Sequence, residues 1–117
     1  MKNTPERLVD KLLQPLRIPP GWLVEYNIFT ELDPVAESME YFWGSVMFAA
    51  SDSARRVGIE LIYEPEGDPK GEFVLDLFRV VTSRDSLGSD TENCRQIRTR
   101  SRQEVVDAIE SFMVNRK

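Results

Sequence analysis

Two alternating segments joined by a short turn-forming connection constrain the fold of this chain most strongly. In residues 57–63 every second side chain from Val57 to Tyr63 is apolar. Residues 72–81 repeat this alternation, with Phe73, Leu75 and Leu77 on one face. A period of two is typical of a β-strand with one buried face. The connection over residues 64–71 contains two prolines and two glycines, which favour a turn. The sequence therefore predicts an antiparallel hairpin.

Two earlier segments extend the predicted sheet. Residues 22–30 are rich in β-branched and aromatic side chains, and strict alternation places Trp22 and Tyr26 on the same face of the strand. Residues 41–50 are apolar on both faces, as in a central strand. We therefore expect two strands before the hairpin.

The stretch after the hairpin predicts a loop and an edge strand. Residues 82–93 are polar and contain Gly88, so we interpret them as an exposed loop. Residues 94–99 predict a short edge strand with Ile97 facing inward.

Both ends of the chain carry helix signals. Thr4 and Pro5 predict a helix start, and Pro15 predicts that this N-terminal helix stops near Gln14. Ser101-Arg102-Gln103-Glu104 is a capping box ahead of an amphipathic segment, which predicts a C-terminal helix. The short connections favour neighbouring antiparallel strands. We expect one α+β domain over residues 1–117, an antiparallel meander of four to five strands with both helices packed on one face.

Missing residue types exclude several classes of chemistry. The chain has no histidine and a single cysteine, Cys94. An intramolecular disulfide, a cysteine-based metal cluster and a Ser-His-Asp or Cys-His catalytic set therefore cannot be built from this chain. No apolar run approaches the ~20 residues of a membrane-spanning helix. We expect a soluble cytoplasmic protein that is not an enzyme, needs no cofactor or metal and does not enter the membrane.

Charge is distributed unevenly along the chain. The total formal charge is −5, yet residues 25–76 contain twelve acidic and only three basic side chains. Residues 77–103 contain six basic and three acidic side chains. The acidic stretch would repel a phosphate backbone, and the basic stretch would attract one.

The acidic side chains concentrate in two connections. In a meander these connections follow the first and third strands, so both lie at the same end of the sheet. The resulting patch could dock on a cationic protein surface, could bind Mg²⁺ or Ca²⁺ although no calcium-loop motif is present, or could be solvated loops. The acids are Glu31, Asp33, Glu37 and Glu40 in the first connection and Glu64, Glu66 and Asp68 in the second.

Arginines and aromatic side chains supply two further candidates. Alternating arginines from Arg95 to Arg102 could bind phosphates, but the same pattern protects an edge strand from unwanted pairing. Aromatic side chains cluster in residues 22–29 and 41–43. Such clusters usually form core, and any members beside the acidic connections, such as Tyr41 or Trp43, could anchor a protein interface.

Several short motifs are scattered along the chain. They are Pro20-Gly21-Trp22, Tyr26-Asn27, Phe29, Asp33-Pro34, the hairpin of residues 64–71 and Thr99-Arg100-Ser101-Arg102. Together they resemble the pattern of small bacterial immunity proteins, which neutralise polymorphic toxins, including the toxins of contact-dependent growth inhibition. The chain departs from this pattern after the last long strand, where residues 81–93 lack the family's Trp and Pro-Leu pair.

The resemblance implies a cytoplasmic inhibitor that binds one cognate toxin domain and carries no catalytic residues. Together with the charge pattern, the resemblance predicts an immunity protein that blocks its toxin by electrostatic and steric contact. The expected toxin is a nuclease with a basic cleft. The alternatives are a nucleic-acid-binding module that uses Arg95–Arg102 and a small-molecule-binding α+β domain with a pocket between sheet and helices. The expected partner-binding residues are Glu31, Asp33, Glu37, Glu40, Tyr41, Trp43, Glu64, Glu66 and Asp68.

Overall fold

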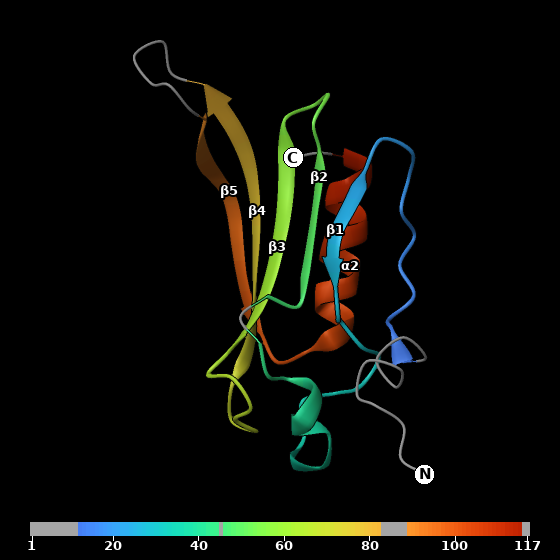
Figure 1. Ribbon diagram of the computed structural model, residues 1–117, viewed down its shortest axis with the longest axis vertical. Helices are drawn as coiled ribbons and strands as arrows, with labels where there is room; N and C mark the ends of the chain where they lie inside the picture. Colours follow the sequence, from blue (N-terminus) through green and yellow to red (C-terminus); the bar gives the residue numbers. More distant parts are fainter. Residues whose placement is uncertain (1–11, 45, 83–88, 116–117) are drawn as a thin grey trace.

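A five-stranded antiparallel sheet with a helix across one face forms the body of the protein (Figure 1). The computed structural model describes residues 12–44, 46–82 and 89–115. The strands follow one another as a meander in the order β1-β2-β3-β4-β5, so the predicted α+β class and meander are confirmed. The strands are β1 (Leu23–Asn27), β2 (Phe48–Asp52), β3 (Val57–Glu64), β4 (Glu72–Thr82) and β5 (Ser89–Thr99).

Two helical elements complete the architecture. The 3-10 helix η1 (Ala36–Tyr41) lies in the connection from β1 to β2, and helix α2 (Arg102–Asn115) follows β5 and lies along the sheet (Figure 1). In the described part of the chain, no helix is both long enough and apolar enough to cross a membrane.

The hairpin of β3 and β4 confirms the alternation predicted from the sequence. Their register pairs Leu61 with Leu75 and Tyr63 with Phe73, and all four side chains are buried. Helix α2 buries the apolar stripe from Val105 to Met113 on this inner face. Burial of this apolar surface is the main force holding helix and sheet together.

The N-terminal segment is extended from Leu13 onward, after a helical residue at Leu12. The predicted helix over residues 5–14 lies largely outside the described residues, and it ends two residues before the predicted Gln14. Leu13 forms an antiparallel bridge with Thr30, and the Gln14 N–H donates to the carbonyl oxygen of Phe29 at 2.9 Å. The segment continues alongside α2, where the Trp22 indole N–H donates to the carbonyl oxygen of Met113 at 3.0 Å.

A β-bulge changes the faces of β1. The register pairs Val24 with Ala50 and Tyr26 with Ala49, so Glu25 is an extra residue without a partner. Trp22 and Val24 pack toward the core, whereas Tyr26 is 47% exposed. The expectation that Trp22 and Tyr26 share a face is wrong, because an extra residue reverses the alternation after it.

The segment before β2 is irregular. A strand over residues 41–50 was expected, but β2 begins at Phe48, and Gly44 has a φ of +115°. Phe42 is buried between the rings of Tyr63 and Phe73, at centroid distances of 4.8 and 6.0 Å. The apolar character of the segment before β2 is therefore explained in part by Phe42, a loop side chain that fills the end of the core.

Strand β5 is longer than the sequence predicts. The edge position and the partly buried Ile97 are confirmed, but β4 runs to Thr82 and β5 begins at Ser89. The predicted loop over residues 82–93 is therefore wrong at both ends, and residues 83–88 lie outside the described residues. An edge strand pairs on one side only and tolerates a polar composition, which hides it from hydrophobic periodicity.

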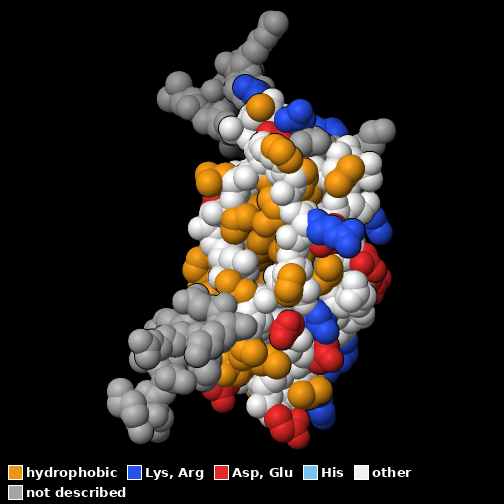
Figure 2. Space-filling model, turned by 90° about the vertical axis from the view of Figure 1, so that its right-hand side faces the viewer, with side chains coloured by type: hydrophobic (Ala, Val, Ile, Leu, Met, Phe, Trp, Pro, Cys, Tyr) orange, Lys and Arg blue, Asp and Glu red, His pale blue; other side chains and the backbone are white. Residues whose placement is uncertain are grey.

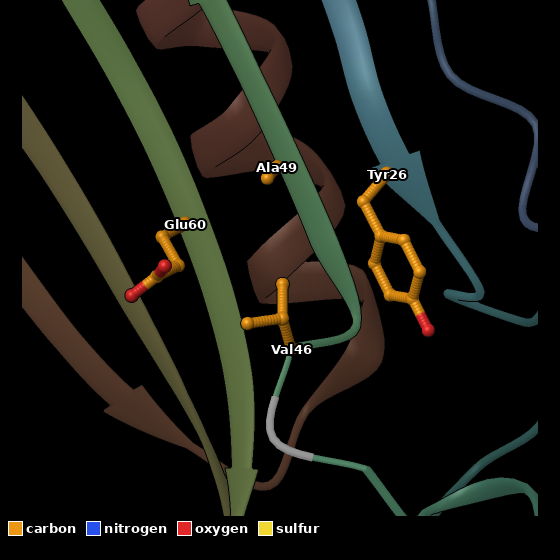
Figure 3. Close-up of a pocket in the computed structure, with 4 residues that line it drawn as sticks. All are labelled: Tyr26, Val46, Ala49 and Glu60. Atoms are coloured by element: carbon orange, nitrogen blue, oxygen red, sulfur yellow. The ribbon is translucent and has the colours of Figure 1, made fainter.

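The outer face of the sheet carries a shallow hollow. Tyr26, Val46, Ala49 and Glu60 line it, with a volume of about 360 Å³. Their side chains lie on the side of the sheet opposite α2 (Figure 3). The hollow therefore does not lie between the sheet and the helix, which is where the alternative small-molecule pocket was expected. Seen from the β1 side, hydrophobic side chains gather in the middle of the molecule and acidic ones mostly in its lower half (Figure 2).

Candidate functional site: an acidic end of the sheet

The two acidic connections meet at one end of the sheet. The β1–β2 connection, which contains η1, and the β3–β4 connection both lie at the lower end in Figure 1. The Gly67 N–H donates to the carbonyl oxygen of Phe42 at 2.9 Å, which joins the two connections directly. The expectation that both connections share one end of the sheet is confirmed. We call this region, residues 31–43 and 64–71, the acidic end.

Arg100 holds the acidic end together. Its guanidinium donates to the carbonyl oxygen of Pro34 at 3.0 Å, to that of Pro69 at 2.8 Å and also to that of Gly71. A guanidinium presents its donors in a rigid plane, so one side chain can bind several carbonyls from two loops at once. The residue therefore fixes the relative positions of the two acidic connections.

Trp43 is displayed at this end and lies against Gly67. The indole is held close to the glycine, since a Cβ placed on Gly67 would lie 2.3 Å from Cε2 of Trp43. Trp43 nevertheless remains 62% exposed. Tyr41, the other predicted anchor, is partly buried and packs against the core. Only Trp43 of the two presents an aromatic surface suited to anchoring a partner.

Four of the seven predicted acids already have interactions within the protein, Glu66 among them. The Asp33 carboxylate accepts from Arg102 Nε at 3.2 Å, and Glu64 pairs with Arg98 at 3.2 Å. Asp68 is half-buried, and its carboxylate accepts the Lys70 N–H at 2.8 Å. These contacts order the connections, and the two arginines reduce the charge that Asp33 and Glu64 offer to a partner.

Glu66 and the three other acids are exposed at the same end. Glu66 lies in the β3–β4 connection, and Glu31, Glu37 and Glu40 lie in the other one. Among the described residues, no ion pair or side-chain hydrogen bond involves the carboxylates of Glu31, Glu37 and Glu40. They are the charges most available for an external contact.

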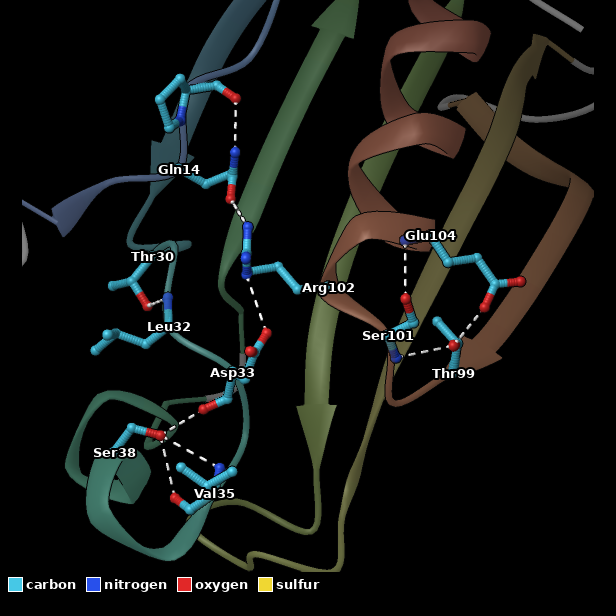
Figure 4. Close-up of polar contacts among 11 residues, drawn as sticks. Gln14, Thr30, Leu32, Asp33, Val35, Ser38, Thr99, Ser101, Arg102 and Glu104 are labelled. Carbon is cyan, nitrogen blue, oxygen red and sulfur yellow. Dashed lines mark hydrogen bonds and ion pairs between the residues drawn. The ribbon is translucent and has the colours of Figure 1, made fainter.

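The network around Asp33 links the acidic end to α2 (Figure 4). Arg102, at the start of α2, contacts both Asp33 and the side-chain carbonyl of Gln14. The Ser38 hydroxyl donates to the backbone carbonyl of Asp33 at 2.5 Å. These contacts position the loop before η1.

The capping box is formed in a modified way (Figure 4). Ser101 Oγ accepts the Glu104 N–H at 3.1 Å, as the motif predicts. The Glu104 carboxylate instead accepts a hydrogen bond from the Thr99 hydroxyl at 2.5 Å, and Thr99 Oγ1 accepts the Ser101 N–H at 3.0 Å. The cap thereby connects β5 to α2 and sets the position of Arg100 between them.

The arginines proposed for phosphate binding are mostly engaged within the protein. Arg98 contacts Glu64 and Glu72, Arg100 binds backbone carbonyls, and Arg102 contacts Asp33. Sequence patterns could not indicate these partners, because each lies more than twenty positions away in the chain. Phosphate binding by this set would require breaking contacts that organise the acidic end.

The described residues contain no group of three or more acidic, cysteine or histidine side chains that could hold a metal ion. No family model, curated protein or solved structure matches this chain. The geometry of the acidic end is therefore the basis for a functional argument.

Proposed function

We propose that this protein is an immunity protein that binds a bacterial toxin domain through the acidic end and blocks its activity in the cytoplasm. The toxin we propose is a nuclease, because a cleft that binds a phosphate backbone is lined with basic side chains. The observation that carries the proposal is the convergence of two acidic connections around the exposed Trp43. The resemblance of the sequence motifs to immunity proteins supports the same class.

The charge distribution suits this mode of binding. Residues 25–76, which supply both connections, have nine more acidic than basic side chains. A concentrated negative patch accelerates encounter with a positive one and discriminates against partners of the same sign. Glu31, Glu37 and Glu40 contribute charge without first breaking a contact within the described structure.

Trp43 supplies the apolar component. Tryptophan is enriched among the residues that dominate binding energy, especially when charged groups surround it and exclude water. Gly67 and the Gly67–Phe42 hydrogen bond keep the loop that carries the indole in place before binding. Such pre-organisation lowers the entropy lost on association.

Co-expression tests the proposal. The C-terminal domain encoded by the gene immediately upstream is expressed in a sensitive bacterium, with this protein or with an empty vector. We expect growth arrest with the empty vector, growth with this protein and co-purification of the two chains. Protection should be lost or reduced on changing Trp43→Ala. An upstream metabolic enzyme, or a toxic domain that this protein neither binds nor neutralises, would contradict the proposal.

A further inference from the structure

The outer face of the sheet carries two pairs of opposed carboxylates, and only one of the pairs is bridged by an arginine among the described residues. The β3–β4 register places Glu64 opposite Glu72 and Glu60 opposite Asp76. Like charges directly opposite one another on neighbouring strands destabilise a sheet. Each pair therefore favours a cation nearby.

The first pair has its cation within the protein. Arg98, on the adjacent strand β5, contacts Glu64 at 3.2 Å and Glu72 at 3.4 Å through the same nitrogen. One guanidinium thus bridges both carboxylates and offsets their repulsion.

The second pair lacks such a bridge among the described residues. On β5, Gln96 lies directly opposite Asp76, and its neutral amide donates to the Asp76 carboxylate at 2.8 Å. Glu60 is exposed, and no described side chain forms an ion pair or hydrogen bond with its carboxylate. Its charge remains available on the outer face.

Glu60 stands at the rim of the hollow lined by Tyr26, Val46 and Ala49 (Figure 3). The exposed ring of Tyr26 lies at the β1 side of the hollow, Glu60 lies at the β3 side, and Val46 and Ala49 lie between them. The Glu60 carboxylate is directed toward β4 and away from Tyr26 (Figure 3), so the ring and the carboxylate lie at the two ends of an apolar floor. An arginine side chain fits this arrangement if its alkyl stem packs on Val46, Ala49 and the Tyr26 ring while its guanidinium binds Glu60.

We propose that the hollow binds an arginine side chain from a basic segment of a protein partner. The inference rests on the proposed function for the partner's identity, and it assigns that partner a second contact outside the acidic end. Charge complementarity favours this occupant, since Glu60 and Asp76 would repel a phosphate or a carboxylate. Arginine is favoured over lysine because its planar group can donate two parallel hydrogen bonds to the Glu60 carboxylate.

An NMR titration of the full chain tests the inference without any toxin. The probe is the blocked tripeptide Ala-Arg-Ala, and the matched control replaces arginine with citrulline, which has nearly the same shape and no charge. We expect saturable shifts of the backbone amides of Tyr26, Ala49 and Glu60 with the arginine peptide only. Equal binding of the citrulline peptide, or shifts that do not include these amides, would overturn the inference.

Two variants sharpen the test. Glu60→Gln should weaken binding of the arginine peptide about fivefold, which is the upper range for the loss of one exposed ion pair. Tyr26→Ala, which removes the ring surface on which the alkyl stem packs, should weaken binding of the peptide by about threefold. Asp107→Asn removes one negative charge from α2, on the other side of the sheet, and should leave affinity unchanged. Unchanged affinity in Glu60→Gln would overturn the inference, while loss of toxin protection with an intact titration would affect only the proposed function.

Discussion

The guanidinium of Arg100 donates a hydrogen bond to the carbonyl oxygen of Pro34 at 3.0 Å, across 66 positions of the chain. The same side chain binds the carbonyl oxygens of Pro69 and Gly71 in the other acidic connection. The link between β5 and α2 thereby controls how two acidic loops are presented together. The proposed binding at the acidic end would therefore depend on a residue that need not contact the partner.

Replacing Arg100 tests this role. Arg100→Ala should lower the free energy of unfolding by about 1–3 kcal/mol, because it leaves backbone carbonyls of both connections without their charged donor. Arg100→Lys should recover only part of this loss, since an ammonium cannot reproduce the planar set of donors. Urea unfolding measures the change.

Arg95→Ala is the matched control, because Arg95 is exposed on the preceding strand β5 and its side chain forms no hydrogen bond or ion pair with the described residues. Its effect should stay within about 0.5 kcal/mol. Equal stability of Arg100→Ala and Arg95→Ala would contradict the proposed role of Arg100 in joining the two acidic connections.

The contact between Trp43 and Gly67 gives a second prediction. Gly67 has a φ of +65°, and an added Cβ would lie within 2.7 Å of three indole atoms of Trp43. Gly67→Ala should therefore displace the indole and cost about 1–3 kcal/mol of stability through overlap and backbone strain. A shifted indole N–H resonance of Trp43 in an NMR spectrum would report the displacement.

A double-mutant cycle separates overlap from backbone strain. In a Trp43→Ala background no indole remains to be displaced, so Gly67→Ala should cost only the left-handed conformation, about 1 kcal/mol. The same cost in both backgrounds would show that the indole does not rest on Gly67.

The two carboxylate pairs of the outer face predict stability changes of opposite sign. Glu60→Gln removes repulsion from Asp76 and should raise the free energy of unfolding by about 0.2–1 kcal/mol. Glu64→Gln removes one partner of Arg98 and should leave stability unchanged or lower it by up to about 1 kcal/mol. Both effects should shrink at high salt, because the groups are exposed. Thermal unfolding at two ionic strengths measures them, and a stabilised Glu64→Gln with a destabilised Glu60→Gln would contradict the assignment.

The sequence predicted the parts of the fold in which local pattern and tertiary burial agree. Alternation from Val57 to Tyr63 coincides with a buried face, and the Ser101 cap stands where α2 begins. Placing both acidic connections at one end required only the meander, which their lengths favoured. These features depend on contacts close in sequence.

Long-range contacts explain what the sequence did not predict. The bulge at Glu25 depends on the register with β2, and it reverses Tyr26 without any glycine or proline to announce it. Phe42 resembles strand core because its burial comes from Tyr63 and Phe73, distant in sequence. Arg100 binds backbone carbonyl oxygens, which every residue carries and which leave no pattern in the sequence. The alternating arginines alone could therefore not indicate that Arg100 joins the two acidic connections.

The association rate with the upstream-encoded toxin domain tests the central claim most directly. Glu37→Lys/Glu40→Lys reverses two charges at the acidic end, and Glu25→Lys/Asp107→Lys applies the same charge change on β1 and α2. Stopped-flow measurement at low salt should show the first variant associating about tenfold more slowly than the second, with the difference vanishing at high salt. Equal rates for the two variants would contradict binding through the acidic end.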